Sequence, residues 1–223
     1  KQSKIILCNS VSTANDLNKF YKVPMSKLFP IKLGFDDKKY YPLKKIRKKF
    51  FLIIGRHNPH KNLGRVIKAF AHAKINNYKL IFVGPFDKRY TPNLIKLIDK
   101  FDIRHLCVWK GWIDDDEKLL LLNECHALII ASLWEGFGLP ALEAMACGTP
   151  VIASNRGALP EVIGDYAYLV NPFDVESISL AMNEVINDKK CFEKAFEDGP
   201  SRAKSFNWLD AVKKIEKIFQ EID

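Results

Sequence analysis

The sequence predicts a doubly wound α/β fold, in which helices cover both faces of a parallel sheet. From Phe50 onward, short runs rich in β-branched and aromatic residues alternate with segments of helical periodicity. The strand-like runs are apolar along their whole length, which is typical of strands buried on both faces. The expected strands are 50–55, 78–84, 106–111, 127–132, 150–154 and 167–172, and the expected helices are 62–73, 91–101, 114–126, 141–148, 159–164 and 174–188.

The first 45 residues precede this regular alternation. A strand is expected over 4–10, a helix over 11–21 and a second strand over 28–36, followed by a lysine-rich linker. We interpret residues 1–45 as the tail of a preceding domain with its linker, and residues 46–205 as the sheet domain.

The last 18 residues, 206–223, predict an amphipathic helix that crosses back over the sheet or over the earlier segment. Its apolar side chains recur at intervals of three and four, which is the helical period. They are Trp208, Val212, Ile215, Ile218 and Phe219.

Composition indicates a globular, cytoplasmic protein without a metal centre. The 223 residues are 48% hydrophobic, which is enough for an ordinary core. No apolar run approaches the roughly 20 residues that span a bilayer. The five cysteines are scattered, with no CxxC pair and no histidine at zinc-ligand spacing, so we expect buried, reduced thiols.

The net charge of +9 is concentrated near the start of the chain. Residues 1–61 carry 15 Lys and Arg against 3 Asp, and "KKIRKK" occupies 44–49. Such a segment suits nucleic acid, an anionic membrane or a phosphate-bearing ligand, although a solvated linker is the simpler interpretation. Because no aromatic residues interleave with the basic ones, we do not expect nucleic-acid binding. If the segment has a role, we favour peripheral contact with the inner face of an anionic membrane.

The loop "EGFGLPALE" carries two acids around a glycine turn. Ligands of doubly wound sheets bind where strands lead into helices. Gly136 and Gly138 allow close backbone approach, and Pro140 suits the first turn of a helix whose N-terminus attracts phosphate. Glu135 and Glu143 need partners if they are buried, and sugar and ribose hydroxyls would serve. Each glutamate alone could equally be a loop cap or a solvated helix residue.

Two cations follow the first strand of the sheet domain. Arg56 and Lys61 lie in "GRHNPHKN", where they could neutralise a diphosphate in the crevice. His57 and His60 lack a third ligand at suitable spacing, so we interpret them as loop histidines. The acids of "IDDDEK" could hold a metal-bound nucleotide, but capping of the following helix explains them.

Together these motifs resemble the retaining glycosyltransferases of the GT-B fold, family 4, typified by sucrose synthase-like and bacterial mannosyltransferase enzymes. Residues 55–62 resemble the G-R…K loop of that family, and 135–143 its E-x7-E motif. Residues 143–165 resemble its most recognisable segment, and 202–208 the start of its closing helix. The resemblance implies the second, Rossmann-like half of a GT-B enzyme. The sequence of residues 154–165 is most similar to that of members that use GDP-mannose.

The resemblance also implies roles for particular residues. Arg56, Lys61 and Glu135 would act on the reacting sugar diphosphate. Residues 111–113 would line the base, 137–139 would present backbone to sugar and phosphate, and Glu143 would bind the ribose. The donor-binding residues implied are Gly111, Trp112, Ile113, Gly136, Phe137, Gly138, Leu139 and Glu143.

The implied chemistry is transfer of a hexose from a GDP- or UDP-sugar to a glycan or lipid-linked acceptor, with no obligatory metal. The similarity of residues 154–165 favours mannose as the hexose. Because such enzymes bind the acceptor in an N-terminal domain, we expect this chain to bind donor but to be inactive alone. A non-catalytic nucleotide-sugar-binding module and a nucleotide-sugar 2-epimerase of the same fold remain as alternatives.

Overall fold

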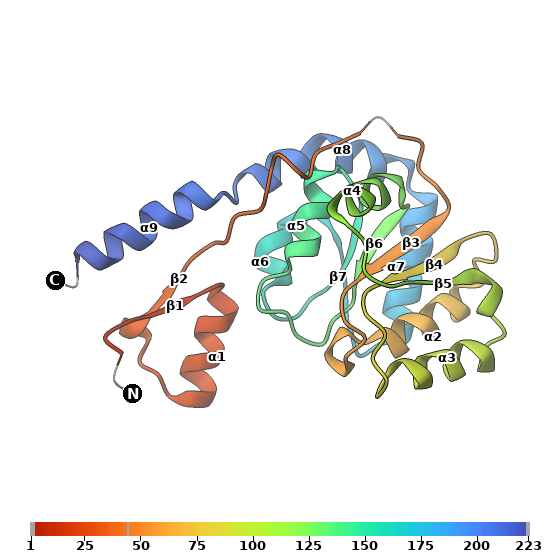
Figure 1. The fold of residues 1–223 in the computed structure, drawn as a ribbon, viewed down its shortest axis with the longest axis horizontal. Helices are drawn as coiled ribbons and strands as arrows, with labels where there is room; N and C mark the ends of the chain where they lie inside the picture. The colour runs from red at the N-terminus through yellow and green to blue at the C-terminus, as the bar shows by residue number, and fades with distance from the viewer. Residues whose placement is uncertain (1–2, 44, 222–223) are drawn as a thin grey trace.

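The computed structural model describes residues 3–43 and 45–221, and its larger sheet has six parallel strands in the order β5-β4-β3-β6-β7-β8 (Figure 1). This sheet confirms the six strands predicted from Phe50 onward. Their bounds are β3 (Phe50–Ile54), β4 (Lys79–Val83), β5 (Cys107–Lys110), β6 (Ala127–Ile130), β7 (Val151–Ser154) and β8 (Tyr168–Val170).

Helices cover both faces of this sheet, as the sequence predicts. One layer consists of α2 (Leu63–Ala73), α3 (Thr91–Lys100) and α7 (Val175–Asn187), and the other of α4 (Asp115–Glu124), α5 (Leu139–Ala146) and α6 (Leu159–Ile163). In Figure 1, α5 and α6 lie to one side of the strands, and α2 and α3 to the other. Each layer buries its own apolar cluster against the sheet, so the doubly wound fold is confirmed.

The N-terminal residues form a small unit of their own. β1 (Ile6–Cys8) pairs in parallel with β2 (Leu28–Pro30), and α1 (Val11–Tyr21) connects them. The helix was predicted correctly, but the strand expected over 28–36 is wrong beyond Pro30. The partner strand β1 is only three residues long, so residues after Ile31, whose N–H donates to Cys8 O at 2.7 Å, have no ladder to join.

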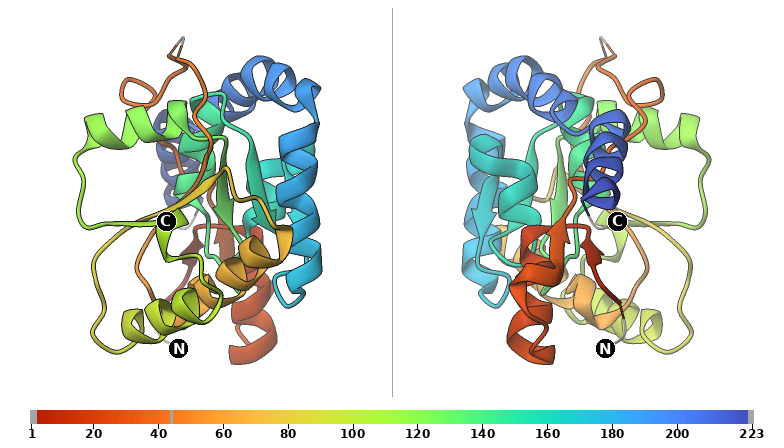
Figure 2. Two further views of the ribbon diagram at one scale, coloured as in Figure 1. Left: turned by 90° about the vertical axis from the view of Figure 1, so that its right-hand side faces the viewer. Right: turned by 90° about the vertical axis from the view of Figure 1, so that its left-hand side faces the viewer.

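The C-terminal helix α9 (Trp208–Gln220) packs onto this N-terminal unit. Ala211 and Ile218 form an apolar cluster with Ile31. Figures 1 and 2 show α9 leaving the sheet domain beside the chain that follows β2. Of the two predicted destinations, the earlier segment is confirmed, but Trp208 and Phe219 of the predicted stripe remain about half exposed.

Helix α8 (Lys189–Lys204) was not predicted, because Gly199 and Pro200 both disfavour a helix interior. Packing explains the glycine. A Cβ at Gly199 would lie 2.6 Å from the Met145 carbonyl oxygen, so glycine lets α8 approach α5 closely. Short 3-10 turns occur at Met25–Lys27, Pro59–Lys61, Arg104–Leu106 and Gly164–Tyr166.

The cysteines are free thiols, as the composition predicts. The thiols are unpaired, and Cys8, Cys125, Cys147 and Cys191 are buried while Cys107 is partly buried. Within 3–43 and 45–221, no helix combines the length and apolar character that a membrane crossing requires.

Candidate functional site

The candidate site lies where the strand order reverses. The chain proceeds outward in both directions from β3 and β6, so a crevice opens between the carboxyl ends of these neighbouring strands. The loops that follow them, residues 55–62 and 131–138, form what we call the loop wall. Their sequences are those in which Arg56, Lys61 and Glu135 were predicted.

The loop wall brings Lys61 and Glu135 into direct contact. Lys61 Nζ lies 2.5 Å from Glu135 Oε1, which also accepts a hydrogen bond of 2.7 Å from Ser132 Oγ. The Lys61 and Glu135 side chains are 20% and 14% exposed. The ion pair is therefore largely buried but remains partly accessible from the crevice. A lysine of the chain itself therefore balances the charge of Glu135.

Asn62, which the sequence analysis did not single out, fastens the loop wall. Its amide donates to the carbonyl oxygens of Ala131 at 2.9 Å and Pro172 at 2.6 Å. Leu133 N also donates to His60 O at 2.8 Å. An asparagine before a helix is normally interpreted as a cap, yet Asn62 lies at φ 59° and its side chain makes no capping bond. It joins three strand ends instead.

Glycines hold the start of α5 against the same loops. Gly138, the N-cap of α5, has φ 102°, and no side chain caps the helix. A Cβ at Gly157 would lie 2.5 Å from the Glu135 carbonyl oxygen, which accepts from Ala158 N at 3.0 Å. Phe137 is buried against Phe206, so only its backbone can serve a ligand. Leu139, the first residue of α5, follows Glu135 by four positions, so the uncapped start of this helix belongs to the same loop as the Lys61–Glu135 pair. A helix start of this kind can bind an anion.

Arg56 shares this crevice without a protein partner. It is exposed, and within the described part of the chain no carboxylate pairs with it. A small pocket between β3 and β6 is lined by Arg56, Lys61 and Ser132 together. One cation is thus fixed on a glutamate while the other is available to an anion.

A second wall, which we call the helix wall, is formed by α4 and α5. Glu143 on α5 is 8% exposed, so its interpretation as a solvated residue is wrong. Lys118 of α4 places Nζ 2.6 Å from Glu143 Oε2. Burial raises the pKa of the Glu143 carboxyl, and the Lys118 ammonium opposes that rise. The sequence gives no sign of this pair, because its two residues lie on separate helices.

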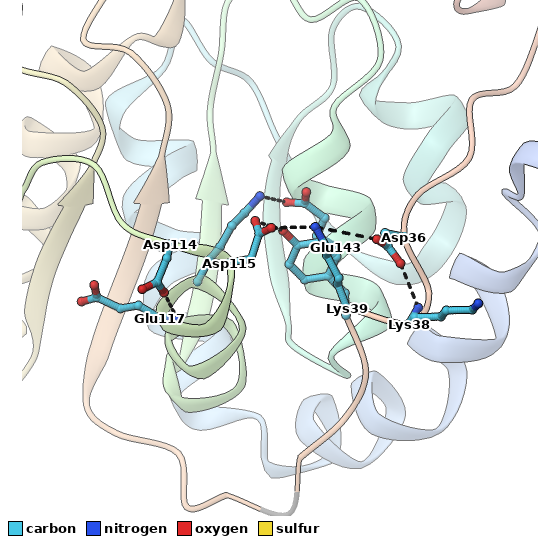
Figure 3. A network of polar contacts seen from close by, with 9 residues as sticks. Asp36, Lys38, Lys39, Asp114, Asp115, Glu117 and Glu143 are labelled. Carbon is cyan, nitrogen blue, oxygen red and sulfur yellow. Dashed lines mark hydrogen bonds and ion pairs between the residues drawn. The ribbon is translucent and has the colours of Figure 1, made fainter.

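The segment before β3 packs on the helix wall (Figure 3). Lys118 Nζ lies 5.0 Å from the centroid of the Tyr40 ring. Tyr40 OH donates to Asp115 Oδ1 at 3.4 Å, and Lys39 Nζ lies 2.8 Å from Asp115 Oδ2. Asp114 accepts from Glu117 N at 2.7 Å, which confirms the predicted cap of α4. Across 3–43 and 45–221, no three His, Cys, Asp or Glu residues are grouped as a metal site.

The basic segment 44–49 is only partly what the sequence predicted. Lys44 lies outside the described residues. Arg47 is not a solvated linker residue, because its guanidinium donates to carbonyl oxygens at the ends of α4 and α5. Its acceptors are Leu122 O at 3.0 Å, Cys125 O at 3.2 Å, Gly148 O at 2.5 Å and Thr149 Oγ1 at 2.8 Å. Lys48 forms a 2.5 Å ion pair with Glu124.

The remaining predicted residues lie near these walls. Gly111, Trp112 and Ile113 follow β5 and lead into α4, with Trp112 82% exposed. His57 is a buried loop histidine whose Nδ1 lies 2.8 Å from Thr91 Oγ1, and burial lowers its pKa. His60 is exposed.

The crevice also contacts the N-terminal unit through Glu161, which lies in the glycine-containing segment 154–161 after β7, and through Trp134, which the sequence did not indicate. The Glu161 carboxylate accepts from Val11 N at 3.0 and 3.2 Å, at the start of α1. Trp134 Nε1 donates to Asp16 Oδ2 at 2.8 Å. The loop after β6 and helix α6 therefore connect the sheet domain to residues that precede the linker.

A parallel, doubly wound sheet whose crevice opens at the switch point of the strand order defines the class of Rossmann-like domains. Residues 36–201 match the family model "Glycosyl transferases group 1". Because this match covers most of the chain, the protein belongs to the glycosyl transferases group 1 family.

Relatives of known name are similar over much of the chain. An MMP alpha-(1->4)-mannosyltransferase of Mycolicibacterium hassiacum is 28% identical over 99% of this chain and 55% of its own length. O-antigen chain mannosyltransferase B of Escherichia coli is 32% identical over 71% of this chain and 42% of its own. The chain thus spans about half the length of these two relatives.

Solved structures share the fold. Sucrose-phosphate synthase of Thermosynechococcus elongatus superposes with a TM-score of 0.86 at 23% identity, over 99% of this chain and 59% of that one. The C-terminal domain of a Francisella tularensis glycosyl transferase group 1 protein gives 0.68 at 27% identity, over 77% and 97%. An Anabaena protein in complex with UDP and glucose gives 0.86 at 20% identity, over 99% and 63%. The fold is therefore that of GT-B glycosyltransferases.

Proposed function

We propose that this chain is the donor-binding half of a retaining mannosyltransferase that uses GDP-mannose and a glycan or lipid-linked acceptor. The observation that carries the proposal is the Lys61–Glu135 pair at the switch point, beside the uncapped N-terminus of α5. It sets a cation and hydroxyl acceptor next to an anion-binding helix end, which suits a sugar diphosphate. The mannosyltransferase names of two relatives support the choice of sugar.

In this mechanism the chain binds the donor and stabilises departure of the nucleotide. Negative charge grows on the diphosphate as the bond to the sugar breaks, and Arg56 and Lys61 interact with that charge most strongly in the transition state. Glu135 accepts from hydroxyls of the transferred hexose and Glu143 from the ribose. Residues 111–113 line the base, and backbone groups of 136–139 contact sugar and phosphate. The sugar keeps its anomeric configuration through an oxocarbenium-like transition state, without an obligatory metal.

The proposal assigns residues 46–205 to the donor domain, 1–45 to the end of an acceptor domain with its linker, and 206–223 to a crossover helix. The relatives are about twice as long as the chain, so we expect donor binding without transfer from these residues alone. We expect the protein to be located in the cytoplasm.

Calorimetric titration of the chain with GDP, UDP and ADP and with their sugar conjugates tests the proposal. We expect one base to be preferred, and Arg56→Ala and Glu143→Ala to weaken binding at least tenfold. Arg104→Ala is the matched control, because Arg104 is exposed and precedes β5. It therefore lies at the amino end of that strand, whereas the crevice lies at the carboxyl ends of the strands. Absence of binding by every nucleotide, or equal loss in the control, would contradict the proposal.

Two alternatives predict different results. A non-catalytic binding module would bind the nucleotide sugar but show no turnover when a complete acceptor domain is supplied. A nucleotide-sugar 2-epimerase would invert the configuration at carbon 2 of the donor sugar without any acceptor. Nuclear magnetic resonance of the reaction mixture would detect this change.

A further inference from the structure

We propose that Lys118 is a positioning residue for nucleotide binding, which holds the Glu143 carboxylate in place for the ribose and is itself held by Tyr40. The inference rests on the proposed function, because it assumes that Glu143 receives the ribose hydroxyls. It adds a residue outside the recognised motifs and makes the segment before β3 part of the nucleotide-binding wall.

The first step is the geometry of the carboxylate. Lys118 Nζ contacts Glu143 Oε2 at 2.6 Å, and Oε2 is buried. The Glu143 side chain as a whole retains 11% exposure. The lysine therefore contacts the buried oxygen Oε2, and we expect Oε1 to accept from a ligand. A carboxylate fixed on one side by a cation loses little conformational freedom when it binds hydroxyls.

The second step is what holds the lysine. Its side chain is 19% exposed and its ammonium lies 5.0 Å from the Tyr40 ring centroid, within cation–π range. Tyr40 in turn donates to Asp115, which also pairs with Lys39. Residues 39 and 40 precede the sheet domain, so a segment distant in sequence fixes a side chain of α4.

The third step concerns charge. Burial raises the pKa of Glu143 and Lys118 opposes that rise, so removing the ammonium would raise the pKa further. The other titratable groups facing Glu143 are Asp115 of α4, Tyr40 and Cys147. The hydrogen bond from Lys39 lowers the pKa of the Asp115 carboxyl. Burial raises the pKa of Tyr40 above its ordinary value and that of Cys147 to about 12. Glu143 is therefore the group of this set whose protonation the removal of the Lys118 ammonium would favour most directly.

Titration of the chain with GDP-mannose between pH 6 and 8.5 tests the inference, because the diphosphate of this ligand carries constant charge in that range. We expect wild-type affinity to change little with pH. Lys118→Met should bind about tenfold more weakly at pH 6 and recover as pH rises, since its Glu143 must deprotonate first. Lys118→Arg should restore the wild-type profile, and Tyr40→Leu should give a smaller loss of the same sign. Lys96→Met, an exposed lysine of α3, is the control.

A comparison of GDP with 2′,3′-dideoxy-GDP at pH 6, where the phosphates of both nucleotides carry the same charge and the Lys118→Met loss is expected, separates positioning from direct contact. We expect wild type to prefer GDP about tenfold, as hydrogen bonds to a charged acceptor allow. Glu143→Gln should lose this preference, and adding Lys118→Met to it should cause no further loss. A pH-independent loss in Lys118→Met, an equal loss for both nucleotides, or an unchanged affinity would each overturn the inference. If wild type binds no nucleotide, the proposed function itself fails.

Discussion

The loop wall and the helix wall of the crevice each end in a buried lysine–glutamate pair, but they are built differently. Lys61–Glu135 joins two loops at neighbouring strand ends, and Asn62 fastens those loops from behind. Lys118–Glu143 joins two helices, and Arg47 fastens their carboxyl ends. The same chemical unit thus arises from loop sequence in one wall and from helix packing in the other. If this is correct, each wall should weaken separately when its fastening residue is removed.

The largest effect is expected from Arg47→Met. The substitution leaves the carbonyl oxygens of Leu122, Cys125 and Gly148 without their charged donor in a partly buried environment. We expect a loss of about 3–5 kcal/mol in the free energy of unfolding, as is usual when one partner of a buried charged network is removed. Urea unfolding measures the loss, and hydrogen exchange should increase first in α4 and α5.

Arg47→Lys keeps the charge but cannot reproduce the planar fork of donors, so an intermediate loss is expected. A loss below about 1 kcal/mol for Arg47→Met would mean that Arg47 is only a solvated linker cation. An exchange increase centred on residues 55–62 would remove the distinction between the two walls.

The two walls also differ in how far the sequence could predict them. The loop wall was anticipated because Arg56, Lys61 and Glu135 follow apolar strands, and strand ends of a parallel sheet meet at one edge. Of the helix wall only Glu143 was anticipated, because the position of Lys118 relative to Glu143 depends on how α4 packs beside α5. Arg47 was hidden for the same reason, since only the folded chain brings helix ends to the linker. Helix propensity did not predict α8, because the close packing that Gly199 allows outweighs its low propensity.

Asn62 offers the corresponding test of the loop wall. Asn62→Gly removes the amide that bonds Ala131 and Pro172 but tolerates the positive φ, and we expect a loss of about 1–3 kcal/mol in the free energy of unfolding. Asn62→Ala should lose about 1 kcal/mol more, because a side chain at φ 59° is strained. Chemical unfolding of both variants gives the values. Exchange should increase in 55–62 and 131–138, and unchanged exchange there would show that the main chain alone holds the loops.

The smallest expected effect is the contribution of His57, in the loop wall, to the pH dependence of the free energy of unfolding. Burial lowers the pKa of His57 below its ordinary value of 6.5. Below about pH 6.5 the unfolded chain therefore binds a proton that folded His57 does not, so stability falls as pH decreases toward the folded pKa. One such group contributes at most about 1.4 kcal/mol per pH unit. His57→Gln should flatten the unfolding free energy between pH 7 and 5, while the contribution of buried His126, whose pKa is lowered in the same way, remains. Equal pH slopes in wild type and variant would mean that His57 accepts its proton in place, and that the loop wall is less tightly closed over it than its 4% exposure implies.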